Sequence, residues 1–253
     1  MFEVERREGV VVVTMNRAPA NAISEEFLAG FNRVLDGIER EGLPRALHIR
    51  SALRFFSAGA DLKEIGGRFG AEEGVRDMLR HVAAFHHLYD RIERLPLVTI
   101  AEINGPALGG GLELALSCDL RIAAQEARIG LPEAGIGLIP GAGGTQRLTR
   151  LCGPGVAARI ILAAEAVDGA TAERLGIVQW AVPGGELPAR ARALADQVAG
   201  LAGPALAACK ACIRAATDRA PDGYAMEHDA TRRLMTTAEA RQRVSAFLES
   251  RRK

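Results

Sequence analysis

The N-terminal third of the chain alternates short apolar runs with amphipathic stretches. Residues 2–6 and 10–15 are strand-like and are separated by Glu8 and Gly9, which predicts two strands joined by a turn. Apolar side chains then recur at helical spacing over residues 27–38, so this stretch is predicted to be an amphipathic helix.

A second series of elements follows the same order. Residues 45–51, "RALHIRS", predict a strand, and residues 97–105, "LVTIAEING", predict a buried one. Between them, "FFSAGADLKEIGG" at 55–67 contains many small residues and predicts a loop without regular structure. Residues 72–94 have the pattern of a long helix.

The middle of the chain is rich in glycine. We expect a helix in "GPALGGGLELALSC", residues 105–118, that begins near Gly109, and a strand in "DLRIAA", residues 119–124. Residues 131–144 predict a glycine-proline loop. Helices are expected from there to the end, broken only by a strand in "IVQWAVP", residues 177–183.

Alternation of strands and helices predicts an α/β fold. We divide the chain into a core of residues 1–192 and a C-terminal helical region of residues 193–253.

Composition narrows the class of protein. Apolar residues make up 48% of the chain and charged residues 25%, which is ordinary for a soluble globular protein. The formal net charge of +1 gives no electrostatic reason to expect nucleic acid or an anionic membrane as a partner. The N-terminal stretch lacks a signal-peptide pattern, and no run reaches the roughly 18 apolar residues of a membrane span. We therefore expect a cytoplasmic location.

Cysteine and histidine do not predict a metal site. The C-x-x-C at Cys209 and Cys212 lies in a helical pattern, and no second pair is spaced to complete a zinc site. His81, His86 and His87 are predicted to lie on one long helix, where surface or packing roles are favoured over metal ligation. Phosphate-binding loops, G-x-S-x-G and H-E-x-x-H are absent from the sequence.

The glycine triplet at residues 109–111 carries the first chemical hypothesis. The first N–H groups of a helix have no intrahelical partner and can hold a developing anion, and glycine lets a ligand approach them. Glu113 follows Gly110 by about one turn, and its leucine neighbours should raise its pKa toward an acid/base range. Alternatively, Glu113 belongs to a solvated stripe and the glycines serve only close helix packing.

Two further segments carry candidate chemistry. Glu133 follows Pro132 in the glycine-proline loop, although it could instead be a favourable acid in the first turn of a short helix. In "FSAGADLKEI", Gly59 and Ala60 are small enough to leave an amide bare, and Lys63 could meet a phosphate, unless this is an ordinary surface turn. Pattern alone does not bring the three segments together.

The combination of "FSAGADLKEI", "INGPALGGGLELALSCDLRIA" and "GLPEAGIGLIPGAGGTQRL" resembles the enoyl-CoA hydratase branch of the crotonase superfamily, and the resemblance extends over nearly the whole chain. It implies a spiral of ββα units followed by a helical C-terminal region that builds homotrimers, often paired into homohexamers. It also implies an acyl-CoA thioester substrate and no separate cofactor, because coenzyme A is part of the substrate.

Carried over residue by residue, the resemblance makes the N–H groups of Ala60 and Gly110 an oxyanion hole for the thioester carbonyl. Glu113 and Glu133 become the acid/base pair that holds a water, and we assign Glu113 to water activation and Glu133 to proton delivery at C2. The residues that the resemblance implies along coenzyme A are Ala58, Ala60, Asp61, Leu62, Lys63 and Gly110, with Ala20 and Ala22 of "APANAI".

Several alternatives stay open. An enoyl-CoA isomerase is the nearest, but isomerases of this superfamily commonly retain only the later carboxylate. A hydratase of branched substrates such as methylglutaconyl-CoA fits the motifs nearly as well. A non-catalytic acyl-CoA-binding or scaffold protein is a third possibility, and an RNA-binding activity lacks a basic-aromatic signature. Arg243 and Val244 depart from the acid and glycine that relatives usually have, which puts a C-terminal contribution to coenzyme A binding or trimer contacts in doubt.

Overall fold

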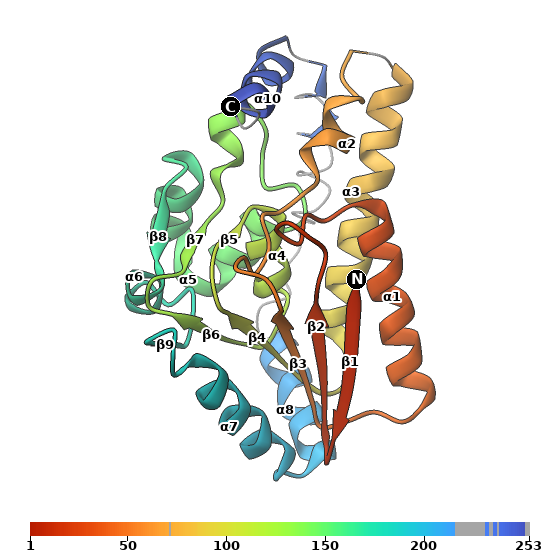
Figure 1. Cartoon of the computed structure of the whole chain (residues 1–253), viewed down its shortest axis with the longest axis vertical. Helices are drawn as coiled ribbons and strands as arrows, with labels where there is room; N and C mark the ends of the chain where they lie inside the picture. The colour runs from red at the N-terminus through yellow and green to blue at the C-terminus, as the bar shows by residue number, and fades with distance from the viewer. Residues whose placement is uncertain (71, 216–230, 233–234, 237, 251–253) are drawn as a thin grey trace.

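The main sheet has six strands, in the order β1-β2-β3-β4-β6-β9, in a computed structural model that describes residues 1–253 except 71, 216–230, 233–234, 237 and 251–253 (Figure 1). Only β1 and β2 pair antiparallel, and the other neighbours pair parallel. The strands are β1 (Phe2–Arg7), β2 (Val10–Met15), β3 (Ala46–Ser51), β4 (Val98–Ile103), β6 (Leu120–Ala124) and β9 (Trp180–Val182).

A second, smaller sheet contains β5 (Ala107–Leu108), β7 (Arg128–Gly130) and β8 (Ala166–Asp168). After β4 the chain passes through β5 into helix α4 (Gly110–Leu116), and after β6 it passes through β7 toward helix α5 (Gly144–Leu162). Each turn therefore visits the large sheet, then the small sheet, then a helix. This is the ββα spiral that the resemblance to the crotonase superfamily implies.

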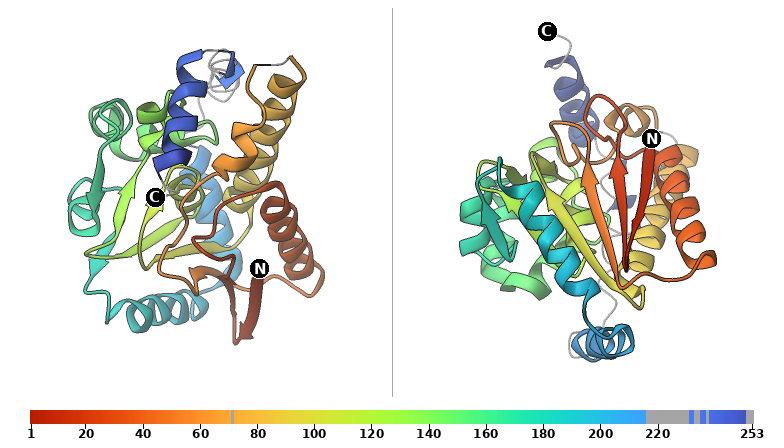
Figure 2. Two further views of the ribbon diagram at one scale, coloured as in Figure 1. Left: turned by 45° about the horizontal axis from the view of Figure 1, so that its top comes forward. Right: turned by 60° about the horizontal axis from the view of Figure 1, so that its bottom comes forward.

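Helices cover both faces of the main sheet. On one face Val11 and Val13 of β2 join a core with side chains of α1 (Glu25–Arg40) and α3 (Glu72–Arg94). On the other face Val10 and Val12 pack with Ala195 of α7 (Leu187–Ala199), which crosses the sheet in the right-hand view of Figure 2. Because both faces of β2 are buried, its first four residues are all valine and do not alternate with polar residues.

Three predictions of irregular or helical structure were wrong in detail. The loop at 55–67 contains helix α2 (Leu62–Gly66), because the Asp61 side chain caps it by accepting from the Lys63 amide at 3.2 Å. The loop at 131–144 contains a 3-10 helix, η1 (Pro132–Ile136), which begins at a proline. The stretch after α5 contains β8, a strand that was not predicted, before the expected helices resume with α6 (Gly169–Arg174).

The C-terminal helices α8 (Gly203–Ala215) and α10 (Ala238–Ser250) lie at opposite ends of the molecule (Figure 1). Lys210 anchors α8 through Nζ, which lies 2.8 Å from Asp119 Oδ2. On α10, Val244 is buried against Ile65 of α2. Residue 192, the predicted boundary, lies within α7. Within the described residues, no helix combines the length and apolarity that crossing a membrane requires.

Candidate active site

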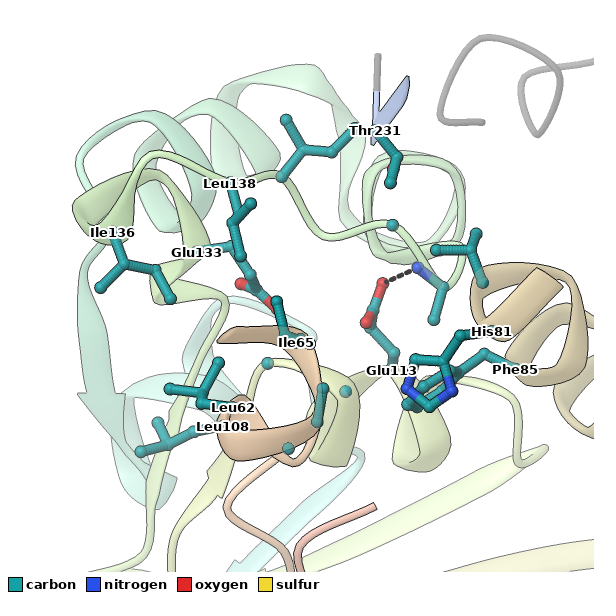
Figure 3. A pocket seen from close by; sticks show the side chains of 18 of the residues that line it. Leu62, Ile65, His81, Phe85, Leu108, Glu113, Glu133, Ile136, Leu138 and Thr231 are labelled. Carbon is teal, nitrogen blue, oxygen red and sulfur yellow. Dashed lines mark hydrogen bonds between the residues drawn. The ribbon is translucent and has the colours of Figure 1, made fainter. Parts of the chain in front are cut away.

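The three segments to which the sequence analysis assigned candidate chemistry, around Ala60, Glu113 and Glu133, meet in one pocket of about 200 Å³. Its wall is formed by α2 and the loop before it, one side of α3, the start of α4 and the segment from η1 toward α5. Glu113 enters from α4 and Glu133 from η1, and Figure 3 shows both carboxyl groups at the same cavity. Most of the remaining lining is aliphatic or aromatic, so the pocket is an apolar chamber with two acids.

Glycine is required at the start of α4 for two different reasons. Gly109 has φ 52° and ψ −128°, a backbone conformation that residues with a side chain rarely adopt. A Cβ at Gly111 would lie 2.5 Å from the Ser57 carbonyl oxygen, so this glycine allows the 57–60 loop to pack closely. The contact at Gly111 confirms the close-packing role that the sequence analysis offered as one alternative.

The amides of Ala60 and Gly110 are close together. Ile23 forms a parallel bridge with Ala60: the Ile23 amide donates to Gly59 O at 2.8 Å, and the Asp61 amide donates to Ile23 O at 3.0 Å. Both bonds use the neighbours of Ala60, so the Ala60 N–H points away from Ile23. A Cβ at Gly110 would lie 3.3 Å from the Ala60 nitrogen.

Helix α3 supports both the start of α4 and the loop before α5. Tyr89 is fully buried and donates its hydroxyl hydrogen to the Gly110 carbonyl at 2.8 Å. Burial, followed by the nearby Glu113, raises the pKa of Tyr89 well above its usual range, so the hydroxyl keeps the proton that it donates. One turn earlier, His86 Nε2 lies 2.7 Å from the Gly141 carbonyl oxygen.

Glu113 is buried, with 2% of its surface exposed, which contradicts the interpretation of a solvated stripe. Its Oε1 accepts hydrogen bonds from the Ala142 and Gly144 amides, each at 2.8 Å. These donors lie at the start of α5, where the helix dipole also favours a negative charge. Burial opposes ionisation, but the two donors and the dipole stabilise the carboxylate form that a general base needs.

Glu133 is half-buried in the first turn of η1, so it is both a pocket acid and an acid at a helix start. Its Oε1 would lie 2.6 Å from a Cβ on Gly109. The carboxyl group therefore reaches the N-terminus of α4, next to the residue that carries the second close amide. Two acids that are separated by the whole of β6 and β7 in the sequence meet at one helix end.

The remaining candidates divide into two groups. Ala58 and Leu62 line the pocket together with Ala60 and Gly110. The other four predicted residues lie outside its lining: Ala20, Ala22, Asp61 and Lys63.

Three of these four residues form contacts that support the loop before α2, and the fourth faces solvent. Asp61 lies 3.1 Å from the Arg17 guanidinium, and Ala20 accepts from the Ala58 amide at 2.9 Å. Ala22 accepts from the Arg17 guanidinium at 2.8 Å. Lys63 is exposed on α2.

His81 is a pocket residue that the sequence analysis assigned only to packing or surface roles. Its side chain is fully buried in the wall between Met78 and Val82 of α3 and stacks edge-on against Phe85. Burial, with a smaller contribution from Arg68, lowers the pKa of His81 to about 4. The signal in the sequence was its place on the apolar side of α3, one turn before Phe85.

Comparison with known proteins gives one consistent family. The family model described as enoyl-CoA hydratase/isomerase matches residues 5–253. A short-chain-enoyl-CoA hydratase of Clostridium acetobutylicum is 35% identical, covering 98% of this chain and 94% of the relative. The mitochondrial methylglutaconyl-CoA hydratase of Mus musculus is 41% identical over 69% of this chain and 54% of the relative. The crystal structure of an enoyl-CoA hydratase from Bacillus anthracis matches with a TM-score of 0.80 and 34% identity, covering 98% of this chain and 96% of that one.

Proposed function

The chain is an enzyme of the enoyl-CoA hydratase/isomerase family, and we propose that it adds water across the C2–C3 double bond of a 2-enoyl-CoA thioester to give a 3-hydroxyacyl-CoA. One observation carries the choice of hydration: Glu113 and Glu133 both line a single pocket beside the close amides of Ala60 and Gly110. Isomerisation needs proton transfer but no water, so one carboxylate would suffice for it.

In this proposal the two amides stabilise charge at the thioester. When hydroxide attacks C3, negative charge moves onto the thioester oxygen, and preorganised N–H groups aimed at that oxygen lower the barrier. The proposal is supported by the orientation of the Ala60 N–H away from Ile23 and by the position of Gly110 at the first turn of α4. The helix dipole adds to the stabilisation.

The two acids divide the proton transfers. Glu113 accepts a proton from the attacking water, and Glu133, which starts protonated, delivers a proton to C2. Transfer of the proton from Glu113 back to Glu133 then resets both acids, so that the atoms of one water are added overall. The assignment of Glu113 as the base is supported by its two backbone donors, which favour its ionised form before the reaction. Because the rest of the pocket lining is mostly apolar, little bulk water should reach Glu113 and interfere with the proton transfer.

A hydratase of branched substrates is the second candidate function. It is favoured by the 41% identity to a relative named methylglutaconyl-CoA hydratase. The same acids and amides would serve that reaction, since the two activities differ only in the acyl group. Coenzyme A stays a part of the substrate in either case, and no further cofactor is proposed.

The test offers purified protein a panel of straight 2-enoyl, branched 2-enoyl and 3-enoyl thioesters and identifies the products by mass. A gain of one water supports hydration, conversion without a mass change indicates isomerisation, and binding without turnover indicates a non-catalytic protein. Glu113→Gln and Glu133→Gln should each lower kcat by roughly 10²- to 10⁴-fold. Glu26→Gln, at an exposed position of α1, is the matched control and should leave kcat unchanged.

We also propose that copies of the chain assemble as a homotrimer or a homohexamer. Large apolar side chains are exposed at Leu151 and Leu162 of α5 and at Ile213 of α8. Covering them would remove apolar surface from water. Sedimentation at micromolar concentration should give a trimeric or hexameric mass, and a monomer would contradict the proposal.

A further inference from the structure

The wall of the pocket contains a polar side chain that the proposed chemistry does not use. The His81 side chain is fully buried, and neither ring nitrogen forms a hydrogen bond with any described residue. The nearest acid is Glu25, whose Oε1 lies 3.9 Å from Nδ1, too far for a hydrogen bond. That oxygen already accepts from the Arg68 guanidinium at 2.6 Å. A buried imidazole without a partner is unfavourable, so a partner supplied by the ligand would be a gain.

The position of His81 relates it to a defined part of a bound acyl chain. Phe85 lies beside the close amides, because its Cε1 would be 3.3 Å from a Cβ on Gly110. The ring of His81 is centred 5.0 Å from the ring of Phe85, one turn farther along α3. With a thioester carbonyl held at the amides and C2 and C3 near the acids, an acyl chain that follows α3 from Phe85 would bring its more distal carbons to His81. Figure 3 shows His81 and Phe85 on the same side of the pocket as Glu113.

The surroundings of His81 favour a neutral partner. Its lowered pKa, about 4, leaves the imidazole uncharged at neutral pH, with one nitrogen as donor and the other as acceptor. Met78, Val82 and Phe85 are its apolar neighbours in the wall. The nearby Arg68 guanidinium lies outside the lining and is already paired with Glu25, so a carboxylate here would lose its hydration without gaining a positive partner in the lining. A hydroxyl or carbonyl oxygen would instead give one ring nitrogen a hydrogen-bond partner.

We propose that His81 determines substrate specificity by hydrogen bonding to a hydroxyl or carbonyl oxygen that the acyl chain carries beyond C3. The inference rests on the proposed function for the acyl-CoA substrate and deepens it by naming a substrate class. It makes the apolar pocket selective for oxygenated chains over plain hydrocarbon chains of the same length.

The test measures binding, so that it does not depend on turnover. Calorimetry compares pairs of saturated acyl-CoA thioesters of equal length, one plain and one with a hydroxyl or keto group at C5, together with a chain that ends in a carboxylate. The unmodified protein should bind the oxygenated member about tenfold more tightly than the plain one, the effect of one buried hydrogen bond. His81→Phe should reduce the ratio to about one. Met78→Leu, an apolar exchange in the same wall, should keep the tenfold ratio.

The outcomes separate this inference from the proposed function. Equal binding of the plain and oxygenated chains by the unmodified protein would overturn the role of His81 alone, and so would tightest binding of the carboxylate chain. Binding of none of the thioesters would overturn the proposed substrate class and this inference with it. If His81→Phe does not fold, His81→Gln offers a donor and an acceptor and should preserve a preference for oxygenated chains.

Discussion

The carboxyl group of Glu133 occupies the space that a side chain at position 109 would need: its Oε1 would lie 2.6 Å from a Cβ on Gly109. Gly109 is also the residue that turns the chain from β5 into α4, with φ 52°. The acid and the helix start are thus fitted to each other, and a single methyl group would disturb both.

Gly109→Ala should therefore lower kcat/KM by about 10²-fold or more, because Glu133 must move and the backbone becomes strained. Steady-state kinetics with a 2-enoyl-CoA checks this. Gly37→Ala in α1 is the matched control, since a Cβ there meets no atom within 4 Å. Gly37→Ala should leave kcat unchanged and stabilise the fold by about 0.5–1 kcal/mol through helix propensity. Full activity in Gly109→Ala would show that the close approach of Glu133 to position 109 is not needed for catalysis.

Tyr89→Phe removes only the hydroxyl that donates to the Gly110 carbonyl. The first turn of α4 should lose part of its fixed position, so kcat should fall about tenfold while KM changes little. The lost buried hydrogen bond should cost about 1 kcal/mol of unfolding free energy. Kinetics and urea unfolding measure the two effects. His87→Gln, at an exposed site on the same helix, should change neither; an unaltered kcat in Tyr89→Phe would remove this residue from the positioning of α4.

His81 should make the fold sensitive to acid. Its pKa is lowered from 6.5 to about 4 in the folded protein, so the unfolded chain binds the proton first as the pH falls. Stability is therefore intact above pH 6.5 and is lost as the pH falls toward 4, by up to about 3 kcal/mol from this residue. Urea unfolding at several pH values should give a smaller loss in His81→Phe than in the unmodified protein. Parallel pH curves for the two proteins would show that His81 titrates normally.

Arg121→Met should destabilise the fold by roughly 2–4 kcal/mol. The buried guanidinium donates to the carbonyl oxygens of Ile177 at 2.8 Å and Cys118 at 2.6 Å, so its loss leaves buried acceptors without a donor. Thermal unfolding measures the loss. Arg128→Met, at an exposed position of β7, is the control and should shift Tm little. Equal Tm shifts for the two variants would contradict the structural role of Arg121.

Long periodic elements could be predicted from the sequence. The helix at 72–94 and the strand pair at 2–6 and 10–15 appear as α3, β1 and β2 with nearly the expected bounds, because each carries its own hydrophobic pattern. The strands β7 and β8 could not be predicted. They have three residues each, too few for a period, and they exist because they pair with each other across the intervening α5.

The sequence pattern identified individual residues of the candidate site but did not predict how they are arranged in space. Glycine and acid patterns nominated Glu113 and Glu133, but the amides that hold Glu113 belong to Ala142 and Gly144, in a segment with no local sign of that role. The outer candidates Asp61 and Lys63 lie outside the pocket lining, because Asp61 caps α2 and pairs with Arg17 while Lys63 is exposed. Contacts of this kind depend on tertiary packing, which a local pattern does not contain.

Helix α3 contacts the Gly110 carbonyl through Tyr89 and the Gly141 carbonyl through His86. The spacing of these two side chains along α3 sets the separation between two parts of the site. One is the start of α4, with the proposed anion-stabilising amide of Gly110, and the other is the loop before α5 that holds the proposed base. An insertion or deletion between His86 and Tyr89 would rotate one of the two side chains by about 100° per residue around the helix axis and so break its contact. The separation of the two contacts could therefore not change gradually during evolution. Length changes among homologues should therefore accumulate between α2 and α3, at residues 67–71, where they would leave the spacing of His86 and Tyr89 unchanged.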